Sequence, residues 1–190
     1  TSERTPEALA LLGQGYRRIA DPTRECEVLE RLVTEFPKNP WSADGLLSLA
    51  AAYSARSDRA GVLKTLLRYQ SRYPDTPLHT DYALWLAEEL VESGSGEAAV
   101  GTLEDLLSRE LKPSEKEKCR FLLATAYEIS NQCEKALEIH ESFLADFPES
   151  SRRLDCLLGA AACSKRIGNK EMATQRVEEG LDLLAKSGGS

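Results

Sequence analysis

Two histidines and five cysteines are the side chains in this sequence best suited to metal binding or nucleophilic catalysis. Histidine binds metals and transfers protons near neutral pH, and a cysteine thiolate is a strong nucleophile. Such chemistry needs these groups at defined spacings, and the sequence contains no HExxH motif, no CxxC motif and no glycine-rich phosphate loop. We therefore expect no metal, no cofactor and no catalytic residue, and we predict that the protein is not an enzyme.

The charge balance argues against nucleic acid as a partner. The 190 residues include 24 basic and 31 acidic side chains, which gives a net charge of -7. The basic residues come in pairs such as Arg17-Arg18 and Lys165-Arg166, whereas a phosphate backbone is bound by clustered cations. The densest apolar stretch, which begins at Gly45, is too short to cross a bilayer. We expect a folded protein that neither binds nucleic acid nor inserts directly into a membrane.

The elements that position these side chains are predicted by a repeat of 37 residues. The segment EFPKNPW at Glu35 returns as RYPDTPL at Arg72 and as DFPESSR at Asp146. At this step the same kind of side chain recurs, and the clearest column holds the small residues Gly13, Ala50, Ala87, Ala124 and Ala161. Within each copy the apolar positions are spaced by three and four, which is typical of one face of a helix. Each copy therefore predicts two antiparallel helices.

Turn and stop residues recur at the same step. A turn between the two helices is predicted at Ala20, Ser57, Gly94, Asn131 and Gly168. Proline ends the second helix at Phe36-Pro37, Tyr73-Pro74 and Phe147-Pro148, because it lacks the amide hydrogen that the helix needs. The next helices are predicted to begin at Asn39-Pro40, at Thr76-Pro77 and at a capping box of Ser114 and Glu117. For the third copy we expect a longer helix end and a shorter turn.

These columns resemble the tetratricopeptide repeat (TPR), a helical hairpin with small residues at the close helix contacts and a proline after the second helix. The resemblance implies an all-α fold, a right-handed α-solenoid of about five hairpins. We expect one repeat domain over residues 1–190, with repeats at approximately 5–38, 39–76, 77–113, 114–150 and 151–187. The 37-residue step is similar to the extended repeats of bacterial envelope lipoproteins of the barrel-assembly and Tol-Pal type. Because the sequence opens on Thr1, we also expect it to be part of a longer protein.

The histidines and cysteines are interpreted from their repeat positions. His140 falls in a column of leucine and valine, which predicts a core residue, and Cys119 and Cys156 share a position where packing favours small side chains. Cys133 is expected in a turn, and a disulfide between Cys119 and Cys156 is conceivable but long. Scattered cysteines favour the cytoplasm, whereas the envelope resemblance suggests the bacterial periplasm, so the compartment stays open.

A stripe along the first helices is the candidate binding surface, because in tetratricopeptide proteins this stripe lines a concave groove that binds peptides. Its predicted partner-binding residues are Arg17, Asp44, Leu47, Ala51, Ser54, Asp81, Leu84, Glu88, Glu92, Phe121, Thr125, Glu128, Lys165 and Arg166. The middle of the stripe is acidic and its ends are basic. We expect a non-catalytic scaffold that binds a partner protein segment with a basic residue near its centre.

A second hypothesis is that the chain is a structural element that self-assembles or stacks on further repeats. Val177, Leu181 and Leu184 give the last predicted helix an apolar face with no following helix in this sequence to cover it. A homo-oligomer through the C-terminal repeat would cover that face. The sequence does not identify the partner or decide between the two hypotheses.

Overall fold

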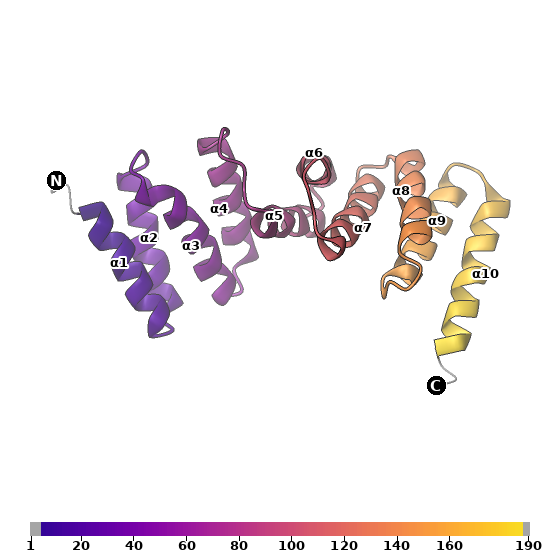
Figure 1. Cartoon of the computed structure of the whole chain (residues 1–190), viewed down its shortest axis with the longest axis horizontal. Helices are drawn as coiled ribbons and strands as arrows, with labels where there is room; N and C mark the ends of the chain where they lie inside the picture. The colour runs from indigo at the N-terminus through magenta and orange to yellow at the C-terminus, as the bar shows by residue number, and fades with distance from the viewer. Residues whose placement is uncertain (1–4, 188–190) are drawn as a thin grey trace. The chain divides into compact units, whose positions relative to one another are not determined.

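The fold consists of helical hairpins. A computed structural model describes residues 5–187, and within this range every regular element is a helix (Figure 1). The helices are α1 (Thr5–Arg18), α2 (Pro22–Glu35), α3 (Trp41–Ala55), α4 (Arg59–Arg72), α5 (Thr80–Glu92), α6 (Gly96–Leu107), α7 (Pro113–Ile129), α8 (Cys133–Asp146), α9 (Arg153–Arg166) and α10 (Lys170–Ser187). The prediction of about five helix-turn-helix repeats with a 37-residue period is confirmed.

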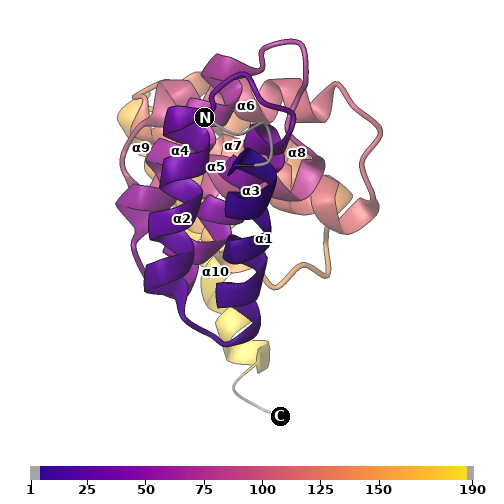
Figure 2. The same cartoon turned by 90° about the vertical axis from the view of Figure 1, so that its left-hand side faces the viewer.

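The chain divides into two compact units, which we describe separately. The N-terminal unit is Thr1–Tyr82 and the C-terminal unit is Ala83–Ser190. In the N-terminal unit α1 contacts α2, α2 contacts α3 and α3 contacts α4, and Figure 2 views this unit end-on. In the C-terminal unit α6, α7, α8, α9 and α10 each contact the next helix along the chain. The assignment of residues 1–190 to a single domain stays a prediction.

The turns inside the hairpins adopt one backbone conformation. All five predicted turn residues have a positive φ: Ala20 (55°), Ser57 (57°), Gly94 (76°), Asn131 (59°) and Gly168 (88°). A left-handed residue after a helix turns the chain back and lets the following amide bond to the helix end. The amide of Asp58, for example, donates to the carbonyl of Tyr53. The predicted turn positions are confirmed, although alanine and serine adopt this conformation less readily than glycine.

Side-chain caps begin several of the second helices. Asp21 accepts a hydrogen bond from the amide of Arg24, and Asp58 accepts one from the amide of Gly61. Asn169 lies at the same repeat position and accepts one from the amide of Met172. Because the first amides of a helix have no partner within it, these contacts fix the first residue of α2, α4 and α10.

The predicted ends of the second helices are confirmed. The residues that terminate α2, α4 and α8 are Phe36, Tyr73 and Phe147, each followed by proline, and each aromatic amide still bonds to the last turn of its helix. Phe147 lies at the end of α8, where its ring centroid is 5.0 Å from that of Phe143. The aromatic ring therefore covers the apolar end of the hairpin.

Of the three predicted helix starts, two were wrong. At the start of α3 the side chain of Asn39 accepts a hydrogen bond from the amide of Trp41, as the predicted cap requires, and Pro40 has helical dihedral angles. The first residue of α5 is Thr80 rather than Pro77, and Leu78, between them, is buried and not helical. The helix α7 begins with Pro113, and the carboxylate of Glu115 accepts a hydrogen bond from the amide of Lys112.

The third repeat also differs from the expectation of a longer helix end. The helix α6 ends at Leu107 and has 12 residues, fewer than any other described helix. The backbone amides of Ser108 and Arg109 bond back to carbonyls of the last turn and close the helix there. The helix α7 then begins early and has 17 residues, so the irregularity lengthens the first helix of the fourth repeat.

Successive repeats are held together by buried apolar contacts and by a recurring polar pair. Leu32, Leu46 and Leu49 are fully buried between α2 and α3, where a side chain on Gly45 would collide with Leu32. At this junction the hydroxyl of Tyr53 donates to Glu30 over 3.1 Å. The same pair recurs between α6 and α7, where Tyr127 donates to Glu104 over 2.5 Å. Burial and the adjacent carboxylate raise the pKa of both tyrosines to about 12.

Candidate functional site

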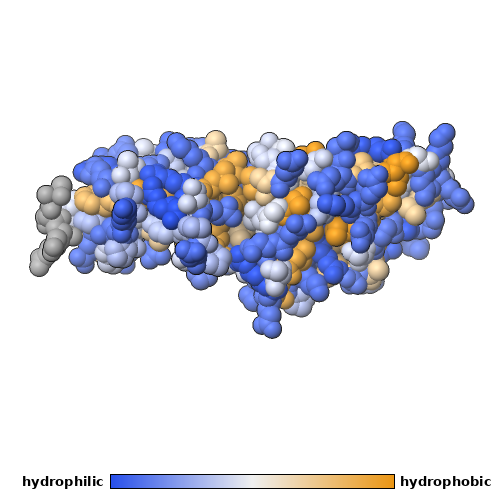
Figure 3. All heavy atoms as spheres, turned by 90° about the horizontal axis from the view of Figure 1, so that it is seen from above, coloured by the Kyte–Doolittle hydropathy of each residue, from blue (hydrophilic) through white to orange (hydrophobic). Residues whose placement is uncertain are grey.

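The first helices of neighbouring repeats lie next to one another within each unit. In the N-terminal unit α1 contacts α3, and in the C-terminal unit α7 contacts α9. The parts of the predicted stripe on α1 and α3, and those on α7 and α9, therefore lie on helices that are in direct contact. The outer surface is largely hydrophilic, with apolar side chains exposed in patches (Figure 3).

In the N-terminal unit the stripe is tied into the fold by Arg17. Its guanidinium forms an ion pair with the buried carboxylate of Glu25 at 2.7 Å and donates to the carbonyl of Ser48 on α3 over 3.0 Å. Arg17 and Asp44 both line a cavity of about 60 Å³ between α1, α2 and α3. Arg17 thus joins the first two hairpins, which the sequence did not indicate.

The remaining predicted site residues of the N-terminal unit differ in exposure. Ser54 and Asp81 are exposed, and Leu47 and Ala51 are half-buried. These four residues therefore form a surface of mixed polarity.

In the C-terminal unit an ion pair connects α5 to α7. The ammonium group of Lys118 lies 2.7 Å from a carboxylate oxygen of Glu88, and both side chains are about one-third exposed. Glu88 was predicted to receive a basic residue of a partner, and the structure shows that it already has an internal one. Leu84, one turn before Glu88 on α5, is buried and contributes little to the surface.

The aromatic side chain of the stripe is Phe121 on α7. Its ring centroid is 6.3 Å from that of Phe143, so one face of the ring packs on the hydrophobic core. The guanidinium of Arg152, next to the start of α9, lies 5.3 Å from the Phe121 centroid. Phe121 is thus half-buried between the core and a cation. The hydroxyl of Thr125 donates to the Phe121 carbonyl and stabilises the same turn of α7.

Glu128 is held by the buried histidine. His140 is 1% exposed, as its repeat position predicted, and its Nε2 lies 2.5 Å from a Glu128 carboxylate oxygen. Because the carboxylate accepts this bond, the proton lies on Nε2, and Nδ1 is buried with no partner among the described residues. Gly159 on α9 leaves room for this contact, since a side chain there would come within 2.4 Å of Nε2. The contact joins α7, α8 and α9.

The basic end of the stripe lies on α9. Arg166 donates to the side-chain oxygen of Asn131 in the turn between α7 and α8, whereas Lys165 is exposed. Glu92, at the end of α5, is exposed as well. Two large apolar side chains on these helices are also exposed, Ile129 at 41% and Leu158 at 50%. They continue the stripe and form its most accessible apolar surface.

The described residues do not form a metal or thiol site. No group of three or more potential metal ligands occurs within residues 5–187, and none of the helices described there is both long and apolar enough to cross a bilayer. All five cysteines are free and buried, so Cys133, which was expected in a turn, is instead a buried residue of α8. Burial raises the pKa of Cys119, Cys156 and Cys163 to about 12.

The repeat fold has counterparts among solved structures. The TPR-like repeats of a Podosopora anserina protein described as a kinesin light chain align over 100% of both chains, with a TM-score of 0.61 and 22% identity. MamA from Desulfovibrio magneticus RS-1 aligns over 98% of both chains, with a TM-score of 0.65 and 15% identity. MamA of MSR-1 aligns over 97% of this chain and 99% of that one, with a TM-score of 0.70 and 16% identity.

The fold is a TPR-type helical repeat. No protein-family model and no curated protein sequence matches the chain. At the identities of the aligned structures the likeness establishes how the chain folds, and what it binds has to be argued from its own residues.

Proposed function

We propose that this protein is a non-catalytic scaffold that binds a segment of a partner protein on the α5–α7–α9 face of its C-terminal unit. We define this face by Glu88, Lys118, Phe121, Glu128, Ile129 and Leu158. The observation that supports the proposal is the exposure of two large apolar side chains, Ile129 and Leu158, beside a row of charged groups on helices in contact. Exposed apolar side chains rimmed by charge are typical of protein interaction surfaces.

The charges on this face favour a partner segment with a basic residue. Glu88 and Glu128 each have one internal partner, Lys118 and His140, and both carboxylates remain partly exposed. A carboxylate accepts several hydrogen bonds, so a lysine or arginine of the partner can share it without breaking the internal contact. The apolar part of the segment would lie over Ile129 and the exposed edge of Phe121. Such charges determine register and specificity more than affinity.

A scaffold without catalysis agrees with the chemistry of the buried groups. His140 is enclosed, and its side-chain contact with Glu128 joins α8 to α7. The buried thiols with a raised pKa are poor nucleophiles at neutral pH. The similarity of the 37-residue step to the repeats of envelope lipoproteins leads to the hypothesis that the partner is bound in the bacterial periplasm.

Capture from a lysate of the source cells, followed by mass spectrometry, tests the proposal with two variants of the face and one control variant. Ile129→Asp removes the apolar anchor, and Leu67→Asp is the matched control because Leu67 is similarly exposed on α4. A charge-swapped variant, Glu88→Lys with Lys118→Glu, keeps the ion pair and reverses its order on the face. We expect a partner that the natural chain and the control retain and that both face variants lose. Equal retention by all four proteins would contradict the proposal.

A second candidate function is self-assembly through the last hairpin. The observation that favours it is the exposure of Val177 and Leu181 on α10, at 43% and 60%. These positions correspond to Leu29 and Val33 on α2, which are buried, Leu29 beside Gly13 of α1 and Val33 beside Gly45 of the following helix. The face on α10 therefore has the character of an internal repeat junction.

A further inference from the structure

Two cavities in this protein are formed from the same repeat positions. The small cavity near the N-terminus is lined by Ala10, Arg17 and Leu29 among others, and a cavity of about 590 Å³ on the last hairpin is lined by Leu158, Lys165 and Val177. These residues correspond pairwise after four repeats of 37 residues, and three further lining residues of each cavity do so as well. The two cavities are thus equivalent positions of the repeat.

The cavities differ because one of them lacks a wall. The N-terminal cavity is closed on its third side by α3, through Asp44, Gly45 and Ser48, and it is reduced to about 60 Å³. The cavity on the last hairpin is lined by residues of α9 and α10. The side that is open in the cavity on the last hairpin corresponds to the side that α3, the first helix of the next repeat, closes in the N-terminal cavity.

The helix α1 carries the side chains that such a wall needs. Its Glu7, Ala8 and Leu11 occupy the repeat positions of Asp44, Gly45 and Ser48. Leu12 is 50% exposed on α1, although every other member of its column is buried. Those members are Leu49, Leu86, Leu123 and Ala160, each exposed by 3% or less. Leu12 is thus an apolar residue that α1 exposes at a position that internal first helices bury.

We propose that α1 of a second copy of this chain docks on the α9–α10 hairpin, in the place that α3 occupies on α1 and α2. The contact is head to tail, because it joins the first helix of one copy to the last hairpin of another. Its register is given by the repeat: Leu12 of the second copy is buried, and Ala8 packs against Leu181 as Gly45 packs against Val33. The inference does not depend on the α5–α7–α9 face.

Polar groups at both ends are complementary in the same register. Glu178 on α10 has the repeat position of Glu30 and Glu104, and Tyr16 on α1 has that of Tyr53 and Tyr127. The Glu–Tyr hydrogen bond seen at two internal junctions would therefore form between copies. Lys165 lines the open cavity at the position of Arg17, and Glu7 of the second copy would face it as Asp44 faces the closed one. In this register the hydroxyl of Tyr16 can donate to the carboxylate of Glu178, and the carboxylate of Glu7 can pair with the ammonium group of Lys165.

The geometry of this contact has consequences for the assembly. Each copy has one α1 face and one α10 face, so the contact is heterologous and every copy can bind one neighbour at each end. Association then proceeds beyond a dimer unless the copies close into a ring. An α10-to-α10 dimer would instead use the same surface twice and would stop at two copies.

Sedimentation velocity over a range of concentrations up to about 1 mM tests the proposal. We expect the average mass of the natural chain to rise with concentration above its monomer value of 21.0 kDa. The variants Leu12→Asp and Val177→Asp each block one face, so each alone should remain a monomer. An equimolar mixture of the two should form a complex of two chains and no larger species, because one intact face of each kind remains. Leu67→Asp is the control and should associate as the natural chain does.

Three results would overturn the proposal. The first is a natural chain that stays at the monomer mass throughout the range. The second is self-association of Leu12→Asp with none of Val177→Asp, which would indicate an α10-to-α10 dimer. The third is a mixture that fails to associate although both variants have the helical content of the natural chain.

A charge-reversal series tests the register of the contact. Glu7→Lys and Lys165→Glu should each weaken association about two- to fivefold, and the double variant should restore it. If the double variant associates no better than the single ones, Glu7 and Lys165 do not face each other and the register is wrong. Failure of these tests leaves the partner-capture result on the α5–α7–α9 face unaffected, so the two proposals fail separately.

Discussion

The contact between Gly159, His140 and Glu128 gives the sharpest stability prediction. In Gly159→Ala the new methyl group would lie 2.4 Å from Nε2 of His140 and 2.6 Å from a carboxylate oxygen of Glu128. At these distances the methyl group overlaps both side chains, so they have to shift. His140 is enclosed by other residues, so its shift disturbs the packing around it. The substitution should therefore separate the two side chains and disturb the junction between α8 and α9.

The size of the effect follows from three contributions. Overpacking a buried position costs about 1 to 3 kcal/mol, and the loss of a hydrogen bond to a charged group costs about 1.5 to 3 kcal/mol. Alanine in place of glycine within a helix returns about 0.5 to 1 kcal/mol. We expect Gly159→Ala to lower the free energy of unfolding of the C-terminal unit by about 1.5 to 5.5 kcal/mol. The matched control is Gly101→Ala on α6, where a methyl group meets no atom within 4 Å and should stabilise by about 0.5 to 1 kcal/mol.

Urea unfolding followed by tryptophan fluorescence measures both changes in the unit concerned. The chain has two tryptophans, so in a Trp41→Phe background Trp85 reports on the C-terminal unit, which contains both glycines. His140→Leu should make room for the methyl group, and Gly159→Ala should then cost at least about 1 kcal/mol less than in the natural chain. If Gly159→Ala stabilises as much as Gly101→Ala does, the described packing around His140 is incorrect.

Three further predictions concern the thiols, the turns and the tyrosines. Since all five cysteines are buried, a thiol reagent at pH 8 should modify none of them rapidly in the folded protein and all five after unfolding; fast labelling of any native thiol would contradict this. Ser57→Gly should stabilise by about 0.5 to 1 kcal/mol in thermal unfolding because Ser57 has a φ of 57°, whereas Ser54→Gly within α3 should destabilise by about 0.5 kcal/mol. For Tyr53 and Tyr127 the folded pKa of about 12 exceeds the ordinary value of about 10, so their contribution to stability is complete below pH 10 and is lost as the pH rises toward 12. Urea midpoints measured between these pH values should fall, and a Tyr53→Phe, Tyr127→Phe variant should show a smaller fall.

The repeat could be read from the sequence because it is specified by local rules. The turn column contains glycine or asparagine in three of its five members, and the backbone of all five positions has the same sign of φ. The helix ends at Phe36, Tyr73 and Phe147 were predictable because proline acts on the residue just before it. Local chemistry therefore decides where the hairpins turn and where they end.

Helix starts were less predictable because burial overrides local preference. Thr76-Pro77 has the residue types of a helix start, yet the burial of Leu78 delays the helix to Thr80. Ser114 and Glu117 have the spacing of a capping box, but Glu117 instead accepts a hydrogen bond from Ser150 at a distant turn. A local pattern does not reveal such competition from side chains far along the chain.

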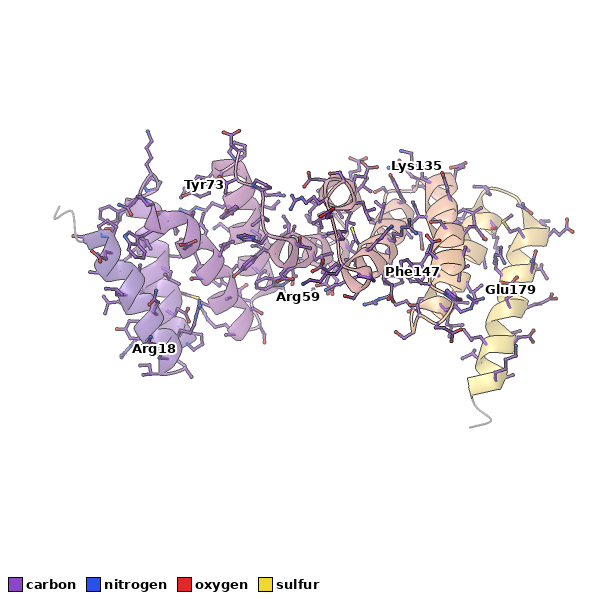
Figure 4. The ribbon with its side chains drawn as sticks, in the orientation of Figure 1. Arg18, Arg59, Tyr73, Lys135, Phe147 and Glu179 are labelled. Atoms are coloured by element: carbon purple, nitrogen blue, oxygen red, sulfur yellow. The ribbon has the colours of Figure 1, made fainter. Side chains whose placement is uncertain are left out.

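The position of the candidate site could be predicted from the sequence, but the internal ion pairs of its charged side chains could not. The stripe on the first helices follows from the 3.6-residue period, and the sequence also places Lys118 one repeat after Asp81 on that stripe. What the sequence could not supply is which charges are already paired, since Glu88 with Lys118 and Glu128 with His140 form across helices. The cation of Arg152 over Phe121 was missed for the same reason. Glu179 on α10, labelled in Figure 4, forms an ion pair with Arg176 of the same helix, three residues earlier.

The recurring Glu–Tyr pair bears on how a chain of this kind can gain or lose hairpins. The pairs Glu30–Tyr53 and Glu104–Tyr127 have the same separation and lie two repeats apart. Deletion of two hairpins by recombination could bring Glu30 to Tyr127 and restore the bond, whereas deletion of one would bring it to Leu90, which has no hydroxyl group. The loss of a hydrogen bond to a charged group costs about 1.5 to 3 kcal/mol, so selection should favour changes of length by even numbers of hairpins.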